Sequence, residues 1–327
     1  MSGAWPARRL LLPLKPLYRL ALAAREAGLG TGLEQVRRLG LPTISIGGLS
    51  AGGSGKTPLT IALARALKQR GLAVDVLSRG YGRQSAKAMR VDIGGSAEEF
   101  GDEPLLIARE TGVPVFVAAQ RYEAGRLAEA SHAAQVHLLD DGYQHRQLHR
   151  DVNILLLDAR DFDDHLLPAG NLREPMSAMR RADIVAIPAG DAELEAKVKA
   201  HRWQGPIWRL RRHMDLPRID TPRIEGPVVA FCGIARSKQF FDGLEAAGLM
   251  LAERIAFPDH HRYTAGDLER LRAAANAAGG EALITTQKDR VRLGEMGDSL
   301  RIETAGLRIE IEDEQEAVDD LMKRAGL

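Results

Sequence analysis

The chain has 327 residues, of which 45% are hydrophobic and 27% charged, as in ordinary soluble globular proteins. This length is long for one domain and comfortable for two. Cys232 is the only cysteine, which excludes an internal disulfide and a cysteine-rich metal site and fits a reducing compartment. The formal net charge is +1, and we expect no nucleic-acid partner.

Residues 1–40 concentrate positive charge, with seven Arg and Lys against two Glu, whereas the remaining residues contain 38 cations and 42 anions. Leucines alternate with these cations, but Lys15 and Arg19 interrupt the apolar run before the about 20 residues that a membrane-spanning helix requires. The recurring charges also disfavour a signal peptide. We predict a basic amphipathic helix that lies in an anionic membrane interface; a helix packed on the protein body, with solvated arginines, is the alternative.

The next 150 residues alternate between apolar runs and helical periodicity, which predicts a parallel sheet with crossover helices. Helical periodicity covers residues 59–69 and 121–133. The predicted strands are residues 43–46, 73–77, 114–117, 136–139, 152–157 and 184–187.

Residues 203–223 are rich in Arg and Pro and are predicted to be a connector. A second alternating block follows, with strands at 228–232, 253–257, 282–285 and 307–311 and helices at 238–246, 265–278 and 314–324. We therefore expect an N-terminal segment at residues 1–40, a core domain at 41–220 and a smaller α/β domain at 221–327.

A glycine-rich loop follows the first predicted strand and opens a helix. Its sequence is Gly52-Gly53-Ser54-Gly55-Lys56-Thr57-Pro58. Glycines let successive backbone N–H groups point at an anion, and the helix N-terminus adds its positive dipole end. Lys56 can reach the β- and γ-phosphates, and the Thr57 hydroxyl can bind Mg²⁺. The strict spacing requires a glycine at position 50, where this chain has Ser50, so the loop is a variant of the phosphate-binding P-loop.

Polar residues follow several other predicted strands. Asp140 and Asp141 end a strand, as the acidic residues that hold Mg²⁺ in P-loop sites do. Arg79 also lies at a strand's carboxyl end, and phosphate sites in parallel sheets lie beyond these ends. Asp102 precedes a helix, and by itself this residue is best explained as a helix cap. His260 lies beside Asp259, an arrangement that suits proton transfer.

Taken together, these segments resemble one family, the tetraacyldisaccharide 4'-kinases of Gram-negative bacteria. The resemblance covers residues 42 to 293, and the order of its motifs is more specific than the phosphate loop alone. The matching motifs are Gly52-Gly53-Ser54-Gly55-Lys56-Thr57-Pro58, Ser78-Arg79-Gly80-Tyr81-Gly82, Gly101-Asp102-Glu103-Pro104, Asp140-Asp141-Gly142-Tyr143-Gln144-His145, Leu167-Pro168-Ala169-Gly170 with Leu172-Arg173-Glu174-Pro175, Phe231-Cys232-Gly233-Ile234-Ala235, Phe257-Pro258-Asp259-His260 and Thr285-Thr286-Gln287-Lys288-Asp289.

The resemblance implies a P-loop NTPase-type sheet flanked by helices, a second α/β domain, and ATP with Mg²⁺ as cofactors. The implied reaction is phosphorylation of the 4'-hydroxyl of an acylated glucosamine disaccharide 1-phosphate, giving lipid IVA, at the cytoplasmic face of the inner membrane. Asp102 would accept the hydroxyl proton, and His260 would orient Asp102. The remaining implied roles are phosphate binding by Lys56 and the loop, metal binding by Thr57, Asp140, Asp141 and Glu174, and phosphate or substrate contacts by Arg79 and Arg173.

Four positions depart from the family's usual residues, and none removes a group assigned to catalysis. Gly48 replaces an Asn that would face nucleotide or substrate, Ser54 a Thr, Asn171 a Pro and Gln287 a Glu. Two other functions are alternatives. A P-loop switch or assembly ATPase usually carries a second lysine where this chain has Ala51, and a soluble small-molecule kinase would not depend on detergent.

Overall fold

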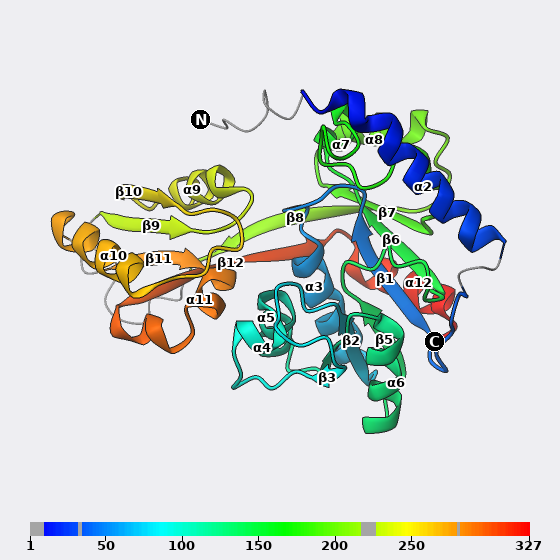
Figure 1. Ribbon diagram of the computed structural model, residues 1–327, viewed down its shortest axis with the longest axis horizontal. Helices are drawn as coiled ribbons and strands as arrows, with labels where there is room; N and C mark the ends of the chain where they lie inside the picture. The colour runs from blue at the N-terminus through cyan, green and yellow to red at the C-terminus, as the bar shows by residue number, and fades with distance from the viewer. Residues whose placement is uncertain (1–9, 32–34, 217–226, 280–281) are drawn as a thin grey trace.

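The computed structural model describes residues 10–31, 35–216, 227–279 and 282–327, which form two lobes joined by two long strands (Figure 1). Twelve strands of the described residues form one sheet, in the order β10-β9-β11-β12-β8-β7-β6-β1-β5-β2-β4-β3. The strands pair in parallel except β12 with β8 and β3 with β4. This arrangement confirms the predicted α/β architecture.

The first lobe contains the predicted alternation of strands and helices. Most of its strands are buried on both faces, as is usual for parallel sheets covered by helices. Its strands are β1 (Thr43–Gly48), β2 (Val74–Ser78), β3 (Met89–Arg90), β4 (Val115–Val117), β5 (Val136–Leu139), β6 (Val152–Leu156) and β7 (Ile184–Pro188). Its helices are α3 (Lys56–Gln69), α4 (Ala97–Phe100), α5 (Asp102–Thr111), α6 (Arg121–Ser131), α7 (Ala159–Asp163), η2 (Met176–Arg181) and α8 (Ala192–Ala200).

The second lobe is a smaller α/β unit. Thr264 begins α10 with a capping box, in which its side chain bonds to the Asp267 backbone and the Asp267 carboxylate returns to the Thr264 backbone. The elements of this part of the chain are β9 (Val228–Cys232), α9 (Ser237–Ala246), β10 (Leu251–Ala256), α10 (Ala265–Ala277), β11 (Leu283–Thr286), α11 (Gln287–Leu293), η3 (Gly294–Ser299), β12 (Ile302–Ile311) and α12 (Glu314–Ala325).

The prediction of a connector at residues 203–223 was wrong for its central part. Residues Ile207–Asp215 form strand β8, which pairs in parallel with β7 and antiparallel with β12. Its arginines alternate with the buried Trp208 and Leu210, so one face is apolar although the composition is basic. Residues 217–223 of the predicted connector lie outside the described residues.

The two faces of the central sheet pack against different helices. In β6, Ile154 and Leu156 belong to the core that includes α3, α5 and α12, whereas Leu155 joins a second core with α8. The second lobe has cores of its own around Phe231 and around Phe241. Helix α12, which follows β12, packs on the first lobe rather than on the second (Figure 1).

A helix at the N-terminus covers part of the second core. Helix α2 (Lys15–Gly30) follows the short turn η1 (Leu12–Leu14) and contacts the body of the protein through the partly buried Tyr18 and Leu22. Leu17 and Leu20 are 67% and 66% exposed. The helix therefore packs on the protein along one side and leaves leucines exposed along another. Arg8 and Arg9 of the basic segment lie outside the described residues.

Candidate functional site

The glycine loop has the backbone that its sequence predicts. Gly52, Gly53 and Gly55 have φ values of 80°, 55° and 96°, a region that side chains with a Cβ rarely adopt. A Cβ on Gly53 would lie 2.8 Å from the Nε of Arg236, so a larger residue there would displace this side chain of the second lobe. Helix α3 begins immediately afterwards, at Lys56. Strand, loop and helix therefore form a phosphate cradle.

Lys56 faces the carboxylates that end β5. Its Nζ lies 3.6 Å from Asp141 Oδ1 and 3.3 Å from Ser54 Oγ. Arg173 binds the same carboxylate through both terminal nitrogens, at 2.9 and 2.7 Å. Burial opposes ionisation of Asp141, but the charges of Lys56 and Arg173 outweigh it and hold the pKa of Asp141 well below its usual range. The structure thus brings Lys56, Asp141 and Arg173 together.

Asp140 has the features of a cation ligand. Its Oδ1 accepts a hydrogen bond from Thr60 at 3.0 Å, while its Oδ2 is buried without a partner in the described structure. Burial and the charges of Glu103 and Asp141 raise the pKa of Asp140 above its usual range, so a nearby cation would favour its ionised form. The described residues contain no cluster of three His, Cys, Asp or Glu that would hold a metal alone. This donor set suits Mg²⁺, which usually shares its ligands with phosphate and water.

Glu174 lies apart from this group. Its carboxylate pairs with Arg181, and the residue does not line the cavity between the lobes. The structure therefore does not bring Glu174 to the other predicted metal ligands.

Asp102 and His260 meet across the two lobes, as predicted. Asp102 begins α5 and is 5% exposed, and His260 Nδ1 lies 3.3 Å from its Oδ2. Arg292 binds the same carboxylate oxygen, with its Nε at 2.8 Å. Burial opposes ionisation of Asp102, but the hydrogen bond from His260 and the charges of Arg292 and Lys288 hold the pKa of Asp102 well below its usual range. Asp102 is thus an anion bound on two sides, which a simple helix cap would not require.

A cavity of about 1070 Å³ joins these groups. Its walls come from both lobes: the first contributes the phosphate loop with Asp140 and Asp141, and the second contributes His260 and Lys288. Asp102 is buried in contact with His260 and, unlike His260, does not line the cavity. His260 is therefore the member of the pair that faces the cavity. The predicted role of Asp102, accepting the proton of the substrate hydroxyl, stays a prediction.

Basic side chains line the first-lobe wall of this cavity. Arg121 is 7% exposed, and its Nε is buried without a partner in the described structure. Burial lowers the pKa of Arg121 to about 10, and burial with the charges of Arg121 and Arg150 lowers the pKa of His145 to about 3. Arg79 lines the same wall. These arginines suit an anionic ligand, although the carboxylates of Asp140 and Asp141 offset part of the charge of Arg121.

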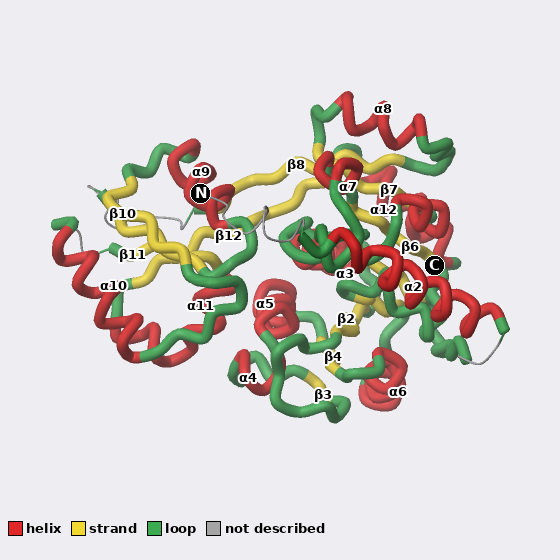
Figure 2. Tube along the Cα trace, turned by 45° about the horizontal axis from the view of Figure 1, so that its top comes forward, coloured by secondary structure: helices red, strands yellow, loops and turns green. Residues whose placement is uncertain are grey.

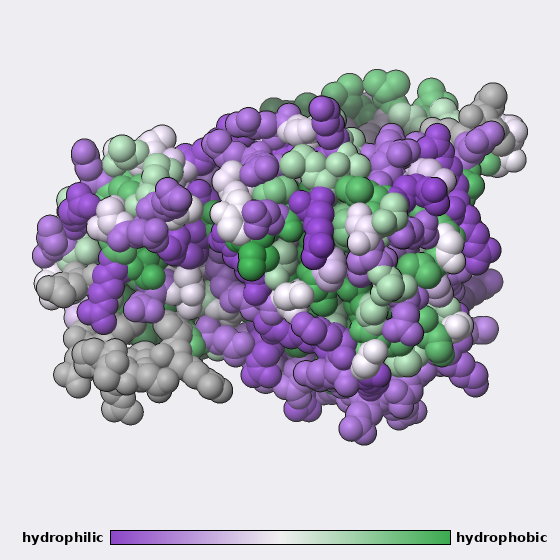
Figure 3. Space-filling view, turned by 90° about the horizontal axis from the view of Figure 1, so that it is seen from below, coloured by the Kyte–Doolittle hydropathy of each residue, from purple (hydrophilic) through white to green (hydrophobic). Residues whose placement is uncertain are grey.

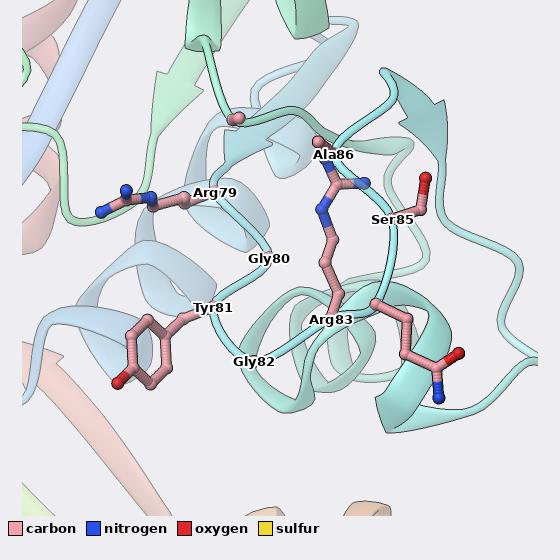
Figure 4. Close-up of a pocket in the computed structure, with 9 residues that line it drawn as sticks. Arg79, Gly80, Tyr81, Gly82, Arg83, Ser85 and Ala86 are labelled. Carbon is pink, nitrogen blue, oxygen red and sulfur yellow. The ribbon is translucent and has the colours of Figure 1, made fainter.

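The loop that carries Arg79 also borders a smaller hollow of about 330 Å³. Figure 4 shows Arg79 and Tyr81 pointing to one side of this loop and Arg83 to the other. The Tyr81 ring lies 5.2 Å from the His260 ring, so the loop contacts the site from the first lobe.

Four functional candidates were missed by sequence reasoning: Arg121, Arg212, Arg236 and Arg292. Arg212 donates to the backbone oxygen of Ser54 in the phosphate loop at 3.0 Å, and Arg236 pairs with Asp158 at 2.9 Å. Their partners are far away in the sequence, so no local spacing indicates them. Arg292 alone carried a local signal, since it lies one helical turn after the motif residue Asp289.

Comparison with known proteins agrees with this geometry. Residues 7–326 match the family described as Tetraacyldisaccharide-1-P 4'-kinase. The chain belongs to this family. A relative from Koribacter versatilis, named Tetraacyldisaccharide 4'-kinase, is 42% identical over 95% of this chain and 97% of its own. A relative of the same name from Neisseria meningitidis is 36% identical over 88% of this chain and 83% of its own.

A solved structure of a family member has the same fold. The Aquifex aeolicus LpxK, described as an apo form in complex with ATP, is 35% identical with a TM-score of 0.78 and covers 98% of this chain and 99% of that one. Family membership thus confirms the resemblance found in the sequence. Among the described residues, no helix has both the length and the apolar character that crossing a bilayer requires.

Proposed function

We propose that this kinase of lipid A biosynthesis transfers the γ-phosphate of ATP to the 4'-hydroxyl of tetraacyldisaccharide 1-phosphate, giving lipid IVA. The observation that carries the proposal is a single cavity lined by the phosphate loop of one lobe and by His260 of the other. Both halves of a phosphoryl transfer, the donor phosphates and the acceptor hydroxyl, have a place there.

The donor end is formed by the first lobe. Lys56 and the backbone amides of Gly52, Gly53, Ser54 and Gly55 hold the β- and γ-phosphates, and Pro58 continues the helix. Thr57, Asp140 and Asp141 would hold Mg²⁺, which when bound neutralises charge on the phosphate oxygens. Asp141 is already ionised and oriented by Arg173 and Lys56. Glu174, which lies apart, is left out of this set.

The acceptor end is formed by the Asp102–His260 pair. We infer that the pair takes up the hydroxyl proton as a unit, with His260 facing the sugar and Asp102 stabilising the charge that His260 acquires. The hydrogen bond to Asp102 raises the pKa of His260, which strengthens it as a proton acceptor. Transfer of a γ-phosphoryl group needs positioning and charge neutralisation more than covalent participation, and this pair supplies the positioning.

The substrate end uses the basic wall and helix α2. Arg79 and Arg121 face the cavity and suit the 1-phosphate of the acceptor, whereas Arg173 acts mainly through Asp141. The exposed leucines of α2 lie on the same lobe and fit a substrate whose acyl chains stay in a bilayer. We therefore place the enzyme at the cytoplasmic face of the inner membrane as a peripheral protein.

The proposal is tested by the choice of acceptor. ADP formation is measured with purified protein in detergent, with the acylated disaccharide 1-phosphate, with its deacylated form, and with no acceptor. We expect turnover only with the acylated acceptor. Equal turnover without acceptor would favour a switch ATPase, and equal turnover with the deacylated sugar would favour a soluble small-molecule kinase.

A further inference from the structure

Arg292 is the most buried cation at the junction of the two lobes. Its side chain is 7% exposed and extends from α11 in the second lobe to Asp102 in the first. Nε lies 2.8 Å from Asp102 Oδ2, and Nη2 binds the same oxygen. Nη2 also lies 3.3 Å from His260 Nδ1. One guanidinium therefore contacts both members of the proposed proton-accepting pair.

The other end of this guanidinium is fixed within the second lobe. Nη1 donates to the backbone oxygen of Gly233 at 2.6 Å and to Asp289 Oδ1 at 3.1 Å. Asp289 is fully buried and also accepts hydrogen bonds from Tyr263 at 2.9 Å and Thr286 at 2.6 Å. Such a network leaves Arg292 little rotational freedom, so the position of its fork sets where Asp102 can bind.

We propose that Arg292 is a positioning residue for the phosphoryl transfer. It holds the Asp102 carboxylate in line with His260 and partly offsets the electrostatic effect of that carboxylate on His260. The inference rests on the proposed function, because it assumes that the pair takes up the hydroxyl proton. It concerns a residue that contacts His260 of the cavity wall but is not itself among the residues that line the cavity.

The charged groups around Asp102 and His260 decide in which direction the two pKa values move when Arg292 is removed. Asp102 faces Arg292, His260 and Lys288, and Lys288 is itself paired with Glu103 at 2.5 Å. His260 faces Asp102, Arg292 and Asp259, the last with its Oδ1 4.0 Å from Nε2.

Arg292 acts on both members in the same direction. Although burial raises the pKa of Asp102, the Arg292 guanidinium is among the charges that lower it. The hydrogen bond to Asp102 raises the pKa of His260, and Arg292 opposes that increase. Removing the guanidinium therefore raises both pKa values. The pair must be unprotonated to accept the hydroxyl proton. As the pH falls, activity is therefore lost at a higher pH in the variant than in the unaltered protein.

The test is the pH dependence of kcat for Arg292→Gln and Arg292→Lys. In Arg292→Gln we expect kcat to fall at least about tenfold at neutral pH, which is less than the roughly 100- to 10,000-fold that a general base itself contributes, because the base is still present. The acid limb of the profile should move to higher pH, while KM for ATP stays unchanged because the phosphate loop is untouched. Arg292→Lys should shift the acid limb less, because the lysine ammonium keeps the positive charge but lacks the several fixed N–H donors of the guanidinium.

Glu110→Ala is the matched control. Glu110 lies on the same helix as Asp102 and accepts a hydrogen bond from Gln287 of α11 at 2.7 Å, so it links the same two helices without contacting the pair. We expect it to lower the melting temperature without moving the acid limb. If Arg292→Gln behaves like Glu110→Ala, with lost stability and an unmoved limb, Arg292 is only a structural contact and the inference is wrong.

Two further results complete the test. Should Arg292→Gln not fold, an unmoved acid limb in folded Arg292→Lys would overturn the inference. Asp102→Asn is measured alongside. If Asp102→Asn keeps normal turnover, the proton-accepting role of the pair fails and the inference falls with it. If Asp102→Asn loses turnover and Arg292→Gln does not, the proposed function stands and only the inference fails.

Discussion

Ser50 shows how the phosphate loop keeps its shape without the first glycine of the usual motif. Ser50 is buried, and the loop beside it is fixed by the Ala51 N–H donating to the backbone oxygen of Asn171 at 2.8 Å. The turns that need left-handed backbone come later, at Gly52, Gly53 and Gly55. The cradle therefore depends on these three glycines rather than on position 50.

Lys56 is predicted to act on phosphoryl transfer more strongly than any other residue of the loop. Lys56→Ala removes a cation from the transferring phosphate, where such contacts are worth about 3 kcal/mol in the transition state, so kcat should fall by at least about a hundredfold. Turnover of ATP measures the effect. Lys68→Ala, on the same helix but bonded to the backbone oxygen of Thr111, is the control and should keep normal turnover. Near-normal turnover of Lys56→Ala would contradict the role of the loop.

Asp102 is predicted to affect chemistry rather than nucleotide binding. Asp102→Asn keeps the shape and can still accept the bond from the Glu103 backbone at 3.0 Å, but it cannot carry the negative charge that stabilises a protonated His260. We expect a large loss of kcat with little change in ATP affinity. Steady-state kinetics and a melting curve check this together. A variant that loses stability but keeps its turnover would show that Asp102 serves only the fold.

Helix α2 packs on the protein along one side and exposes leucines along another. Tyr18 donates to the backbone oxygen of Arg173 at 3.0 Å, and Arg25 donates to that of Gln144 at 2.6 Å, so one side of α2 packs beside the site. Leu17 and Leu20 remain exposed on the helix. Figure 3 shows a face with many hydrophilic residues, on which hydrophobic residues also gather, among other places along the upper right edge. Both interpretations of the N-terminal segment, packing and membrane contact, thus have a physical basis.

We predict that the exposed leucines bind the protein to membranes. Leu17→Ser with Leu20→Ser should weaken binding to anionic liposomes while leaving ATP binding intact, because neither leucine is buried. Binding of the unaltered protein should also weaken with salt, since attraction between exposed charges is screened beyond about 8 Å at physiological ionic strength. Met250→Ser is the control, an equally exposed hydrophobic residue of the second lobe. Equal liposome binding by the double variant would place the membrane contact elsewhere.

Local sequence patterns did not predict strand β8 or the true start of strand β12. Six strands of the first lobe and its helices α3 and α6 were predicted because regular apolar runs alternate there with helical periodicity. Charged residues hide the same alternation in β8, where Arg209, Arg211 and Arg212 surround a short apolar face. β12 extends from Ile302, five residues before the predicted start, since its early residues pair with β11 in the second lobe. Pairing between distant segments decided both cases.

At the scale of the whole molecule, the site depends on contacts between the lobes. The tube drawing shows α5 of the first lobe facing α11 of the second (Figure 2). Motif residues such as Lys56, Asp102 and His260 could be predicted because they occur in ordered motifs. Arg236 could not be predicted, because its importance arises from a partner in the other lobe, and for Arg292 the only local signal is its helical spacing from Asp289. The sequence likewise could not show that His260, rather than Asp102, faces the cavity.

Ion pairs between the lobes should make the stability of the whole protein depend on acid pH. Burial opposes ionisation of Asp158, but its bonds to Arg160 and the charge of Arg236 lower its pKa to about 2. Asp102 is shifted in the same direction. A carboxylate with a lowered folded-state pKa stabilises the fold above its unfolded value of about 3.9, and this stabilisation is lost as pH falls below that value. The melting temperature should therefore fall as the pH drops below that unfolded value. In Asp158→Asn the melting temperature should fall less steeply over the same pH interval. An identical decrease in the variant would exclude Asp158 as a contributor.

The most direct measurement is the position of the transferred phosphate. Purified protein is incubated in detergent with ATP labelled on the γ-phosphate and with tetraacyldisaccharide 1-phosphate, and the lipid product is analysed by mass spectrometry and NMR, with Lys56→Ala as the inactive control. We predict one new phosphate on the 4'-oxygen for each ADP formed, because the phosphate loop and His260 line the same cavity. Hydrolysis of ATP without label on the lipid, or phosphate on another hydroxyl, would contradict this account.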